Sequence, residues 1–126
     1  MNIVILKGNI TKEPEIRTLP NGTLVAEASV AVTKKYRDKN GELKEDTSFF
    51  DIRTFGYRAE FVKNFVSKGS PVLIEGKLKQ DKWESEGKNR YRVLVVANSI
   101  QLLAWKKQPE DMPPHTPEED SDDIPF

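Results

Sequence analysis

The chain has 126 residues, a net charge of zero, one histidine and no cysteine. This length suits one domain with a single core, and the lack of cysteine excludes disulfides, thiol catalysis and Cys-based zinc sites. The chain has no apolar run of about 18 residues, so a membrane-spanning helix is not expected. The start of the chain also lacks the pattern of a signal peptide, so we expect a cytoplasmic protein with no membrane partner.

Alternation of apolar and polar residues predicts that most of the chain forms β-strands. Apolar residues occupy every second position from Leu24 to Val32, which is the period of a strand with two distinct faces. Turn signals lie at 20–22, 38–41 and 86–89. The predicted strands are 3–10 with a continuation through 15–19, 23–33, 47–55, 71–79 and 90–97, with a short strand near 100–104.

One segment between the third and fourth predicted strands has helical periodicity. Its apolar residues form one stripe: Phe61, Val62, Phe65 and Val66. Gly69 follows as a stop signal. Short strands with one helix at this position predict an all-β chain with one helix, namely an OB-fold, which is a five-stranded Greek-key barrel. A plain β-sandwich is the alternative.

Residues 106–126 differ from the rest of the chain in charge and composition. They carry 2 Lys and Arg against 7 Asp and Glu, whereas residues 1–105 carry 18 against 13. We therefore predict a folded domain at 1–105 and a flexible linker rich in proline and acid at 106–120, which has too little apolar surface to order itself. A separate tip follows at 121–126.

The tip combines acidic and apolar residues. We interpret it as a peptide presented to a partner protein, because its carboxylates suit a basic pocket and its apolar side chains suit a hydrophobic one. The residues of this predicted contact are Asp122, Asp123, Ile124, Pro125 and Phe126. The alternative is a frayed tail that is acidic for solubility.

The third predicted strand carries aromatic residues on the face that points away from the core. Phe50 and Ile52 are expected to face the core. The outward residues are then Phe49, Asp51, Arg53 and Phe55. Exposed rings are costly unless a base or a subunit interface covers them, and the sequence leaves both interpretations open. Asp51 opposes phosphate binding on this face, and we assign it as a local partner of Arg53.

Two predicted hairpins combine an aromatic ring with several cations, and in an OB-fold they flank one groove. Rings for stacking and cations for the backbone are what a protein needs to bind single strands without sequence preference. The predicted stacking rings are Tyr36, Phe49, Phe55 and Trp83. The predicted phosphate contacts are Lys34, Lys35, Arg37, Arg53, Lys77, Lys79, Lys82, Arg90 and Arg92.

The remaining aromatic residues are assigned to packing, with Trp105 in the core or an interface. They are Tyr57, Phe61, Phe65, Tyr91 and Trp105. Catalysis is not expected, because the single histidine, His115, lies among the prolines of the tail and no phosphate-cradling glycine loop is apparent. We expect neither a metal site nor a cofactor.

Several separated motifs resemble those of bacterial-type single-stranded DNA-binding proteins. The matching segments are 4–10 (VILKGNI), 14–17 (PEIR), 20–22 (PNG), 68–70 (KGS), 74–78 (IEGKL), 82–83 (KW) and the terminal DDIPF. They occur in the family's order through the predicted domain and again at the tip.

This resemblance implies an OB-fold homotetramer that binds single-stranded DNA without sequence preference. It also implies protection of exposed strands in DNA replication, recombination and repair, recruitment of replication and repair proteins through the tip, and a cytoplasmic, nucleoid-associated location. The four rings would stack on bases, although Tyr36 and Phe49 stand where relatives often have Trp. Two interpretations stay open beside it: an OB-fold interaction module whose groove binds protein, and an RNA-binding OB domain.

Overall fold

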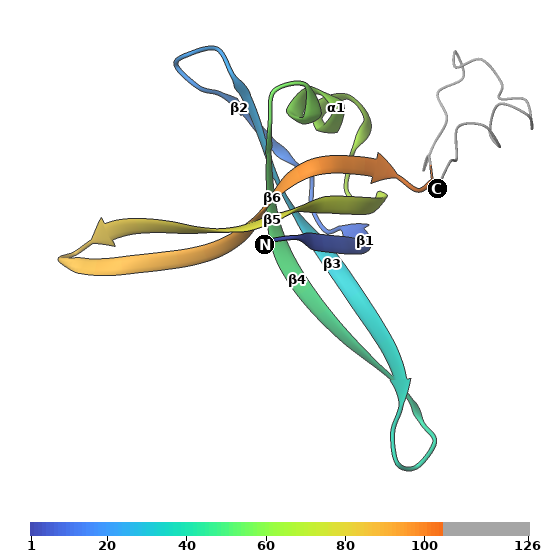
Figure 1. The fold of residues 1–126 in the computed structure, drawn as a ribbon. Helices are drawn as coiled ribbons and strands as arrows, with labels where there is room; N and C mark the ends of the chain where they lie inside the picture. Colours follow the sequence, from blue (N-terminus) through green and yellow to red (C-terminus); the bar gives the residue numbers. More distant parts are fainter. Residues whose placement is uncertain (105–126) are drawn as a thin grey trace, which may run out of the picture.

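Six strands and one helix follow one another in an order that closes a small barrel. The computed structural model describes residues 1–104. Its elements are β1 (Val4–Ile10), β2 (Glu15–Thr18), β3 (Leu24–Arg37), β4 (Leu43–Phe55), α1 (Tyr57–Phe65), β5 (Pro71–Ser85) and β6 (Lys88–Leu102) (Figure 1). Trp105, the predicted linker and the predicted tip lie outside the described residues.

Strands β1, β3, β4, β5 and β6 form the barrel. The sheet order is β1-β5-β6-β4-β3-β2, and β1 also pairs with β3 at Asn9 and Ile10, which closes the ring. All pairings are antiparallel except that of β4 with β6. The short β2 pairs with β3 and is the last strand in this order. The predicted OB-fold is confirmed, and the β-sandwich alternative is wrong.

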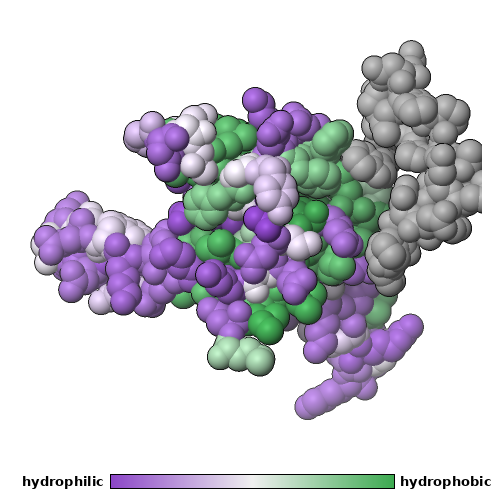
Figure 2. Space-filling model, turned by 45° about the horizontal axis from the view of Figure 1, so that its top comes forward, coloured by the Kyte–Doolittle hydropathy of each residue, from purple (hydrophilic) through white to green (hydrophobic). Residues whose placement is uncertain are grey.

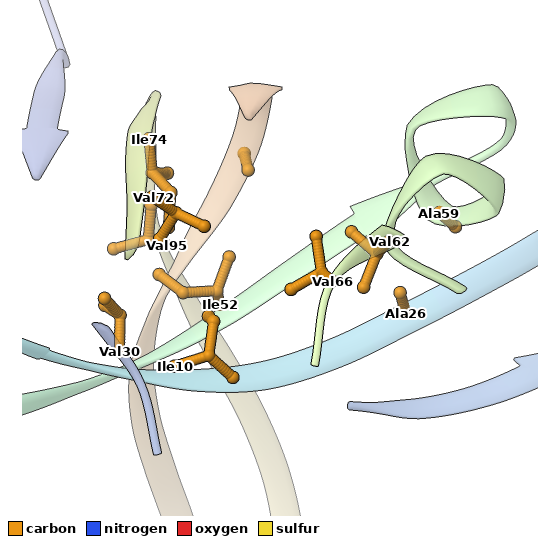
Figure 3. Close-up of a cluster of buried hydrophobic side chains, with 11 residues drawn as sticks. Ile10, Ala26, Val30, Ile52, Ala59, Val62, Val66, Val72, Ile74 and Val95 are labelled. Carbon is orange, nitrogen blue, oxygen red and sulfur yellow. The ribbon is translucent and has the colours of Figure 1, made fainter. Parts of the chain in front are cut away.

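Branched aliphatic side chains fill the barrel. Figure 3 shows Ile52 on β4, with Ile74 and Val95 from the β5–β6 side and Val62 from the helix side. Each of these side chains is at most 4% exposed. β-Branched residues suit a pleated surface that is buried on one face. The helix completes this core, and Ala59 and Val62 are its buried positions.

Two hairpins continue beyond the barrel as long arms (Figure 1). The β3–β4 arm ends in a turn in which the Asp38 carboxylate accepts hydrogen bonds from the backbone N–H groups of Asn40 and Glu42, each at 2.9 Å. The β5–β6 arm ends at Glu86 and Gly87, which both have positive φ, as a two-residue turn of type I′ requires. Figure 2 shows that the projecting segments are mostly hydrophilic and that apolar residues gather on the central body.

The strands of these arms are longer than the sequence predicted. β3 continues to Arg37, β4 begins at Leu43 and β5 continues to Ser85, while β6 unites the predicted strands at 90–97 and 100–104. Outside the barrel neither face of a strand is buried. The apolar alternation that marks a strand therefore stops, although the backbone ladder continues.

Three aromatic side chains assigned to packing are exposed instead: Tyr57 at 72%, Tyr91 at 58% and Phe65 at 48%. The short α1 faces the barrel with Ala59 and Val62, so the Phe65 ring lies at its side, 5.3 Å between ring centres from Phe61. Phe61 packs against the core, as predicted. Among the residues described, no helix has the length and hydrophobicity needed to cross a bilayer.

Candidate nucleic-acid interface

The four predicted stacking rings are all partly exposed. The exposed fractions are 45% for Tyr36, 66% for Phe49, 39% for Phe55 and 47% for Trp83. Tyr36 lies near the end of the β3–β4 arm, and Trp83 lies near the end of the β5–β6 arm. None of these four rings is buried in the core, so each can present a flat surface to a ligand.

β4 presents Phe49 and Phe55 on the face that points away from the core, as predicted. On the opposite face Ile52 and Thr54 are buried, at 4% and 1% exposed. Phe50 shares this inner face but is 38% exposed, so its prediction as a core residue is wrong. β4 pairs with β6 only at Ile52 and Arg53, which leaves Phe50 at the rim of the barrel.

Tyr36 does not share a face with Phe49 and Phe55. The β3–β4 register pairs Ala31 with Phe49 and Tyr36 with Lys44. Paired residues share a face, and successive residues alternate between faces. Tyr36 therefore lies on the opposite face of this hairpin from Phe49. The expected single groove lined by all four rings is not formed along this hairpin.

Charged side chains join the β5–β6 arm to β4. Arg53 donates from Nε to Glu27 at 2.9 Å and from Nη2 to Asp81 at 3.0 Å, with Nη1 3.4 Å from the second Asp81 oxygen. Asp51 accepts a hydrogen bond from Nε of Arg92 at 3.2 Å, and Nη2 of Arg92 lies 2.9 Å from the same carboxylate oxygen as an ion pair. The predicted partner of Asp51 was Arg53, and that assignment is wrong.

These contacts shift two pKa values. The hydrogen bond from Arg53 lowers the pKa of Asp81, with smaller contributions from the charges of Arg53, Lys79 and Arg92, against a desolvation cost. Burial by itself lowers the pKa of the Arg53 guanidinium, but hydrogen bonds and attraction from Asp81 and Glu27 outweigh burial and raise it. Both groups are therefore charged at neutral pH.

The other predicted phosphate contacts are exposed side chains on the two hairpins: Lys34, Lys35, Arg37, Lys77, Lys79, Lys82 and Arg90. Two of them have partners. Arg37 donates to the Gly41 carbonyl at 2.8 Å, and Lys79 lies 3.7 Å from Asp81. Cations thus accompany both Tyr36 and Trp83.

Sequence reasoning missed Glu27 and Asp81. Glu27 lies directly opposite Arg53 in the β3–β4 register. Counting back from the predicted turn at 38–41 would have placed Ala26 opposite Arg53, because the loop between Arg37 and Leu43 is one residue longer than predicted. Asp81 belongs to the other hairpin, and no local signal links it to Arg53. Within residues 1–104, no group of three or more His, Cys, Asp or Glu side chains is arranged to hold a metal ion.

Residues 1–103 match the model of the Single-strand binding protein family. The chain belongs to this family. Among curated members, it is 38% identical over 121 residues to the single-stranded DNA-binding protein of Aquifex aeolicus (strain VF5), covering 90% of this chain and 82% of the relative. It is 34% identical over 113 residues to that of Helicobacter hepaticus, covering 89% of this chain and 66% of the relative, slightly under two thirds of that protein.

Solved structures of single-strand binding proteins share the barrel. A Plasmodium falciparum SSB complex with ssDNA matches with a TM-score of 0.74 and 25% identity, covering 82% of this chain and 96% of that one. A deletion mutant of the single-stranded DNA binding protein from Thermus aquaticus matches with a TM-score of 0.73 and 28% identity, covering 84% and 52%.

Proposed function

We propose that this chain binds single-stranded DNA without sequence preference and keeps strands unpaired during DNA replication, recombination and repair. The observation that carries this proposal is the exposure of four rings, at 39–66%, on strands rich in lysine and arginine. Rings in such settings suit stacking on unpaired bases. Membership of the family and similarity to a structure described as a complex with ssDNA support the proposal.

The position of Tyr36 affects the path that a bound DNA strand takes over the protein. A strand that contacts Phe49 and Phe55 reaches Tyr36 only by passing around the β3–β4 hairpin. Each stacked base contributes about 1–3 kcal/mol. The proposed phosphate contacts are the exposed cations Lys34, Lys35, Arg37, Lys77, Lys79, Lys82 and Arg90. Arg53 and Arg92 are left out, because carboxylates already accept their N–H groups.

We also propose a homotetramer. The outward-facing Ile5 of β1 is 64% exposed. Ile3, which directly precedes β1, is 61% exposed. Pairing of β1 with β3 is confined to Asn9 and Ile10 among the described residues, so one edge of β1 is available to a second copy.

The remaining parts of the proposal concern the whole chain. One part is the division of the chain into a DNA-binding domain at 1–105, a linker at 106–120 and a tip at 121–126. The others are recruitment of replication and repair proteins through the tip, the absence of catalysis, and a cytoplasmic, nucleoid-associated location. The acidic and apolar composition of the tip supports the recruitment role.

Fluorescence of Trp83 tests the binding role. In a Trp105→Phe chain only Trp83 reports, and we expect oligo(dT) to quench it strongly at low salt while duplex DNA does not. Phe55→Ala should weaken oligo(dT) binding by about 1–3 kcal/mol in a chain that stays folded, because this ring is 39% exposed and faces away from the core. Tyr57→Ala is the control, since Tyr57 is exposed at the start of α1, outside both hairpins.

Two results would contradict the proposal. Absence of quenching would favour the interaction module, whose groove binds protein. Equal or higher affinity for oligo(U) would favour the RNA-binding domain.

A further inference from the structure

The β5–β6 arm leaves the barrel beside β4 (Figure 1). Five charged residues lie close together at this point. We call them the charge clasp: Glu27, Asp51, Arg53, Asp81 and Arg92. Arg53 lies at its centre, with its side chain 15% exposed and hydrogen bonds to Glu27 and Asp81. A guanidinium that meets a carboxylate through two N–H groups is held more firmly and more directionally than a lysine in an exposed pair.

Acidic and basic residues of the charge clasp alternate along β4 and also across the β5–β6 ladder. Asp51 and Arg53 are two residues apart on one face of β4, and Asp81 and Arg92 are direct partners across the β5–β6 ladder. A shift of the arm that exchanged these contacts would place Asp51 beside Asp81. The same shift would place Arg53 beside Arg92, and contacts between like charges are unfavourable. The clasp therefore favours one placement of the arm over the shifted one.

The two faces that the clasp joins also carry stacking rings. Phe49 and Phe55 stand two residues to either side of the acidic and basic residues on β4. Trp83 stands two residues after Asp81 and so shares its face, together with its cross-strand partner Arg90. The position of Trp83 relative to the rings of β4 thus depends on how the arm is seated.

We propose that the charge clasp positions the β5–β6 arm so that Trp83 and the rings of β4 contact one DNA strand together, with Arg53 as a positioning residue and not a phosphate ligand. The inference rests on the proposed function. A two-stranded arm has little rigidity of its own, and holding a binding surface in place before the ligand arrives reduces the ordering cost of binding. A phosphate at Arg53 would also displace Glu27 and Asp81, leaving these half-buried carboxylates only their longer 3.7 Å contacts with Arg17 and Lys79.

Two charge-neutralising variants separate positioning from phosphate binding: Arg53→Gln and Asp81→Asn, each in the Trp105→Phe chain. Affinity for oligo(dT) is measured against salt concentration. Positioning predicts that both variants bind about tenfold more weakly, with an unchanged slope of log affinity against log salt. A phosphate role for Arg53 predicts tighter binding by Asp81→Asn, because a competing carboxylate is gone. It also predicts a slope about 0.7 smaller for Arg53→Gln.

Each variant has a control with the same charge change at an exposed position of the β5–β6 arm. Glu84→Gln removes an exposed acid from the other face of β5, and we expect its affinity to stay equal or rise slightly. Lys82→Gln removes an exposed cation, and its slope should fall by about 0.7. The proposal is overturned if Asp81→Asn behaves like Glu84→Gln, or if Arg53→Gln behaves like Lys82→Gln.

Time-resolved anisotropy of Trp83 in the DNA-free protein tests the clasp apart from the proposed function. We expect faster depolarisation in Arg53→Gln and Asp81→Asn than in Glu84→Gln, and an unchanged rate would overturn the clasp. A wild-type chain that does not bind oligo(dT) would instead contradict the proposed function. Arg53→Lys covers the case in which Arg53→Gln does not fold, since lysine keeps the charge but lacks the fork that joins two carboxylates. It should depolarise faster as well.

Discussion

Arg53 and Lys82 carry the same charge in different surroundings. The Arg53 side chain is 15% exposed and bonded to two carboxylates, whereas Lys82 is exposed on the β5–β6 arm. An exposed cation attracts phosphate in a salt-dependent way, while a partly buried and paired one ties strands together. The role of a basic residue in this barrel therefore depends on which acids the fold brings to it.

Asp81 should make stability depend on pH on the acid side. Its pKa lies below the ordinary value of 3.8 in the folded chain because of the hydrogen bond from Arg53, and Lys79 and Arg92 add to the effect. A carboxyl group with a lowered folded pKa stabilises the fold above its unfolded pKa, and this contribution is lost as pH falls through the folded value. Asp81→Asn should therefore melt below wild type at neutral pH, with a gap that narrows in acid.

Thermal unfolding followed by circular dichroism at neutral pH and at about pH 3 measures this gap. A gap of the same size at both pH values would contradict the role of the ionised carboxylate.

The hairpins divide into two parts with different physical support. Inside the barrel, side chains such as Val30 and Ile52 are buried, and the core fixes the strand. Further out, toward Arg37 and Trp83, both faces are exposed and only the ladder and cross-strand contacts remain, such as the 3.0 Å hydrogen bond between the hydroxyls of Thr33 and Thr47. Contacts at the base of an arm then decide its direction, which is why the charge clasp matters for the β5–β6 arm.

Closure of the barrel depends on a close backbone approach at Gly8. A Cβ added there would lie 2.2 Å from the carbonyl oxygen of Ala31 and 3.0 Å from Cγ2 of Val30. The obstacle is mainly backbone, so Gly8→Ala should push β1 away from β3 and destabilise the fold by about 1–3 kcal/mol. Each kcal/mol corresponds to roughly 4–8 °C in Tm for a domain of this size.

Differential scanning calorimetry of Gly8→Ala beside Lys7→Ala checks this expectation. Lys7 is the exposed neighbour, so its variant should melt close to wild type. Equal melting of both variants would mean that the β1–β3 approach tolerates a methyl group.

Over the whole molecule, charge is divided between the two parts of the chain. Residues 1–105 have an excess of Lys and Arg, at 18 against 13 acids, and residues 106–126 have an excess of acids, at 7 against 2. An acidic segment competes with a polyanion for the same cations. Binding of DNA and release of the tip to partner proteins would then be coupled.

Deletion of residues 121–126 tests this division of roles. We expect oligo(dT) affinity to stay equal or rise slightly, because acidic competitors are removed, while capture of replication and repair proteins is lost. Fluorescence titration and pull-down with the full and shortened chains provide the two measurements. A shortened chain that lost oligo(dT) binding would contradict the assignment of the tip to partners alone.

The sequence by itself determined the barrel and the outward face of β4, because strand periodicity, turn signals and one apolar helical stripe are local properties. Ile52 faces inward and Phe49 faces outward as counted along the strand. Only the tertiary structure decided that Asp81 and Arg92 meet Arg53 and Asp51, since those residues come from different hairpins whose placement follows from packing of the whole barrel. For the same reason it decided that Phe65 and Tyr57 stay exposed, because the surface that a short helix buries depends on the strands beneath it.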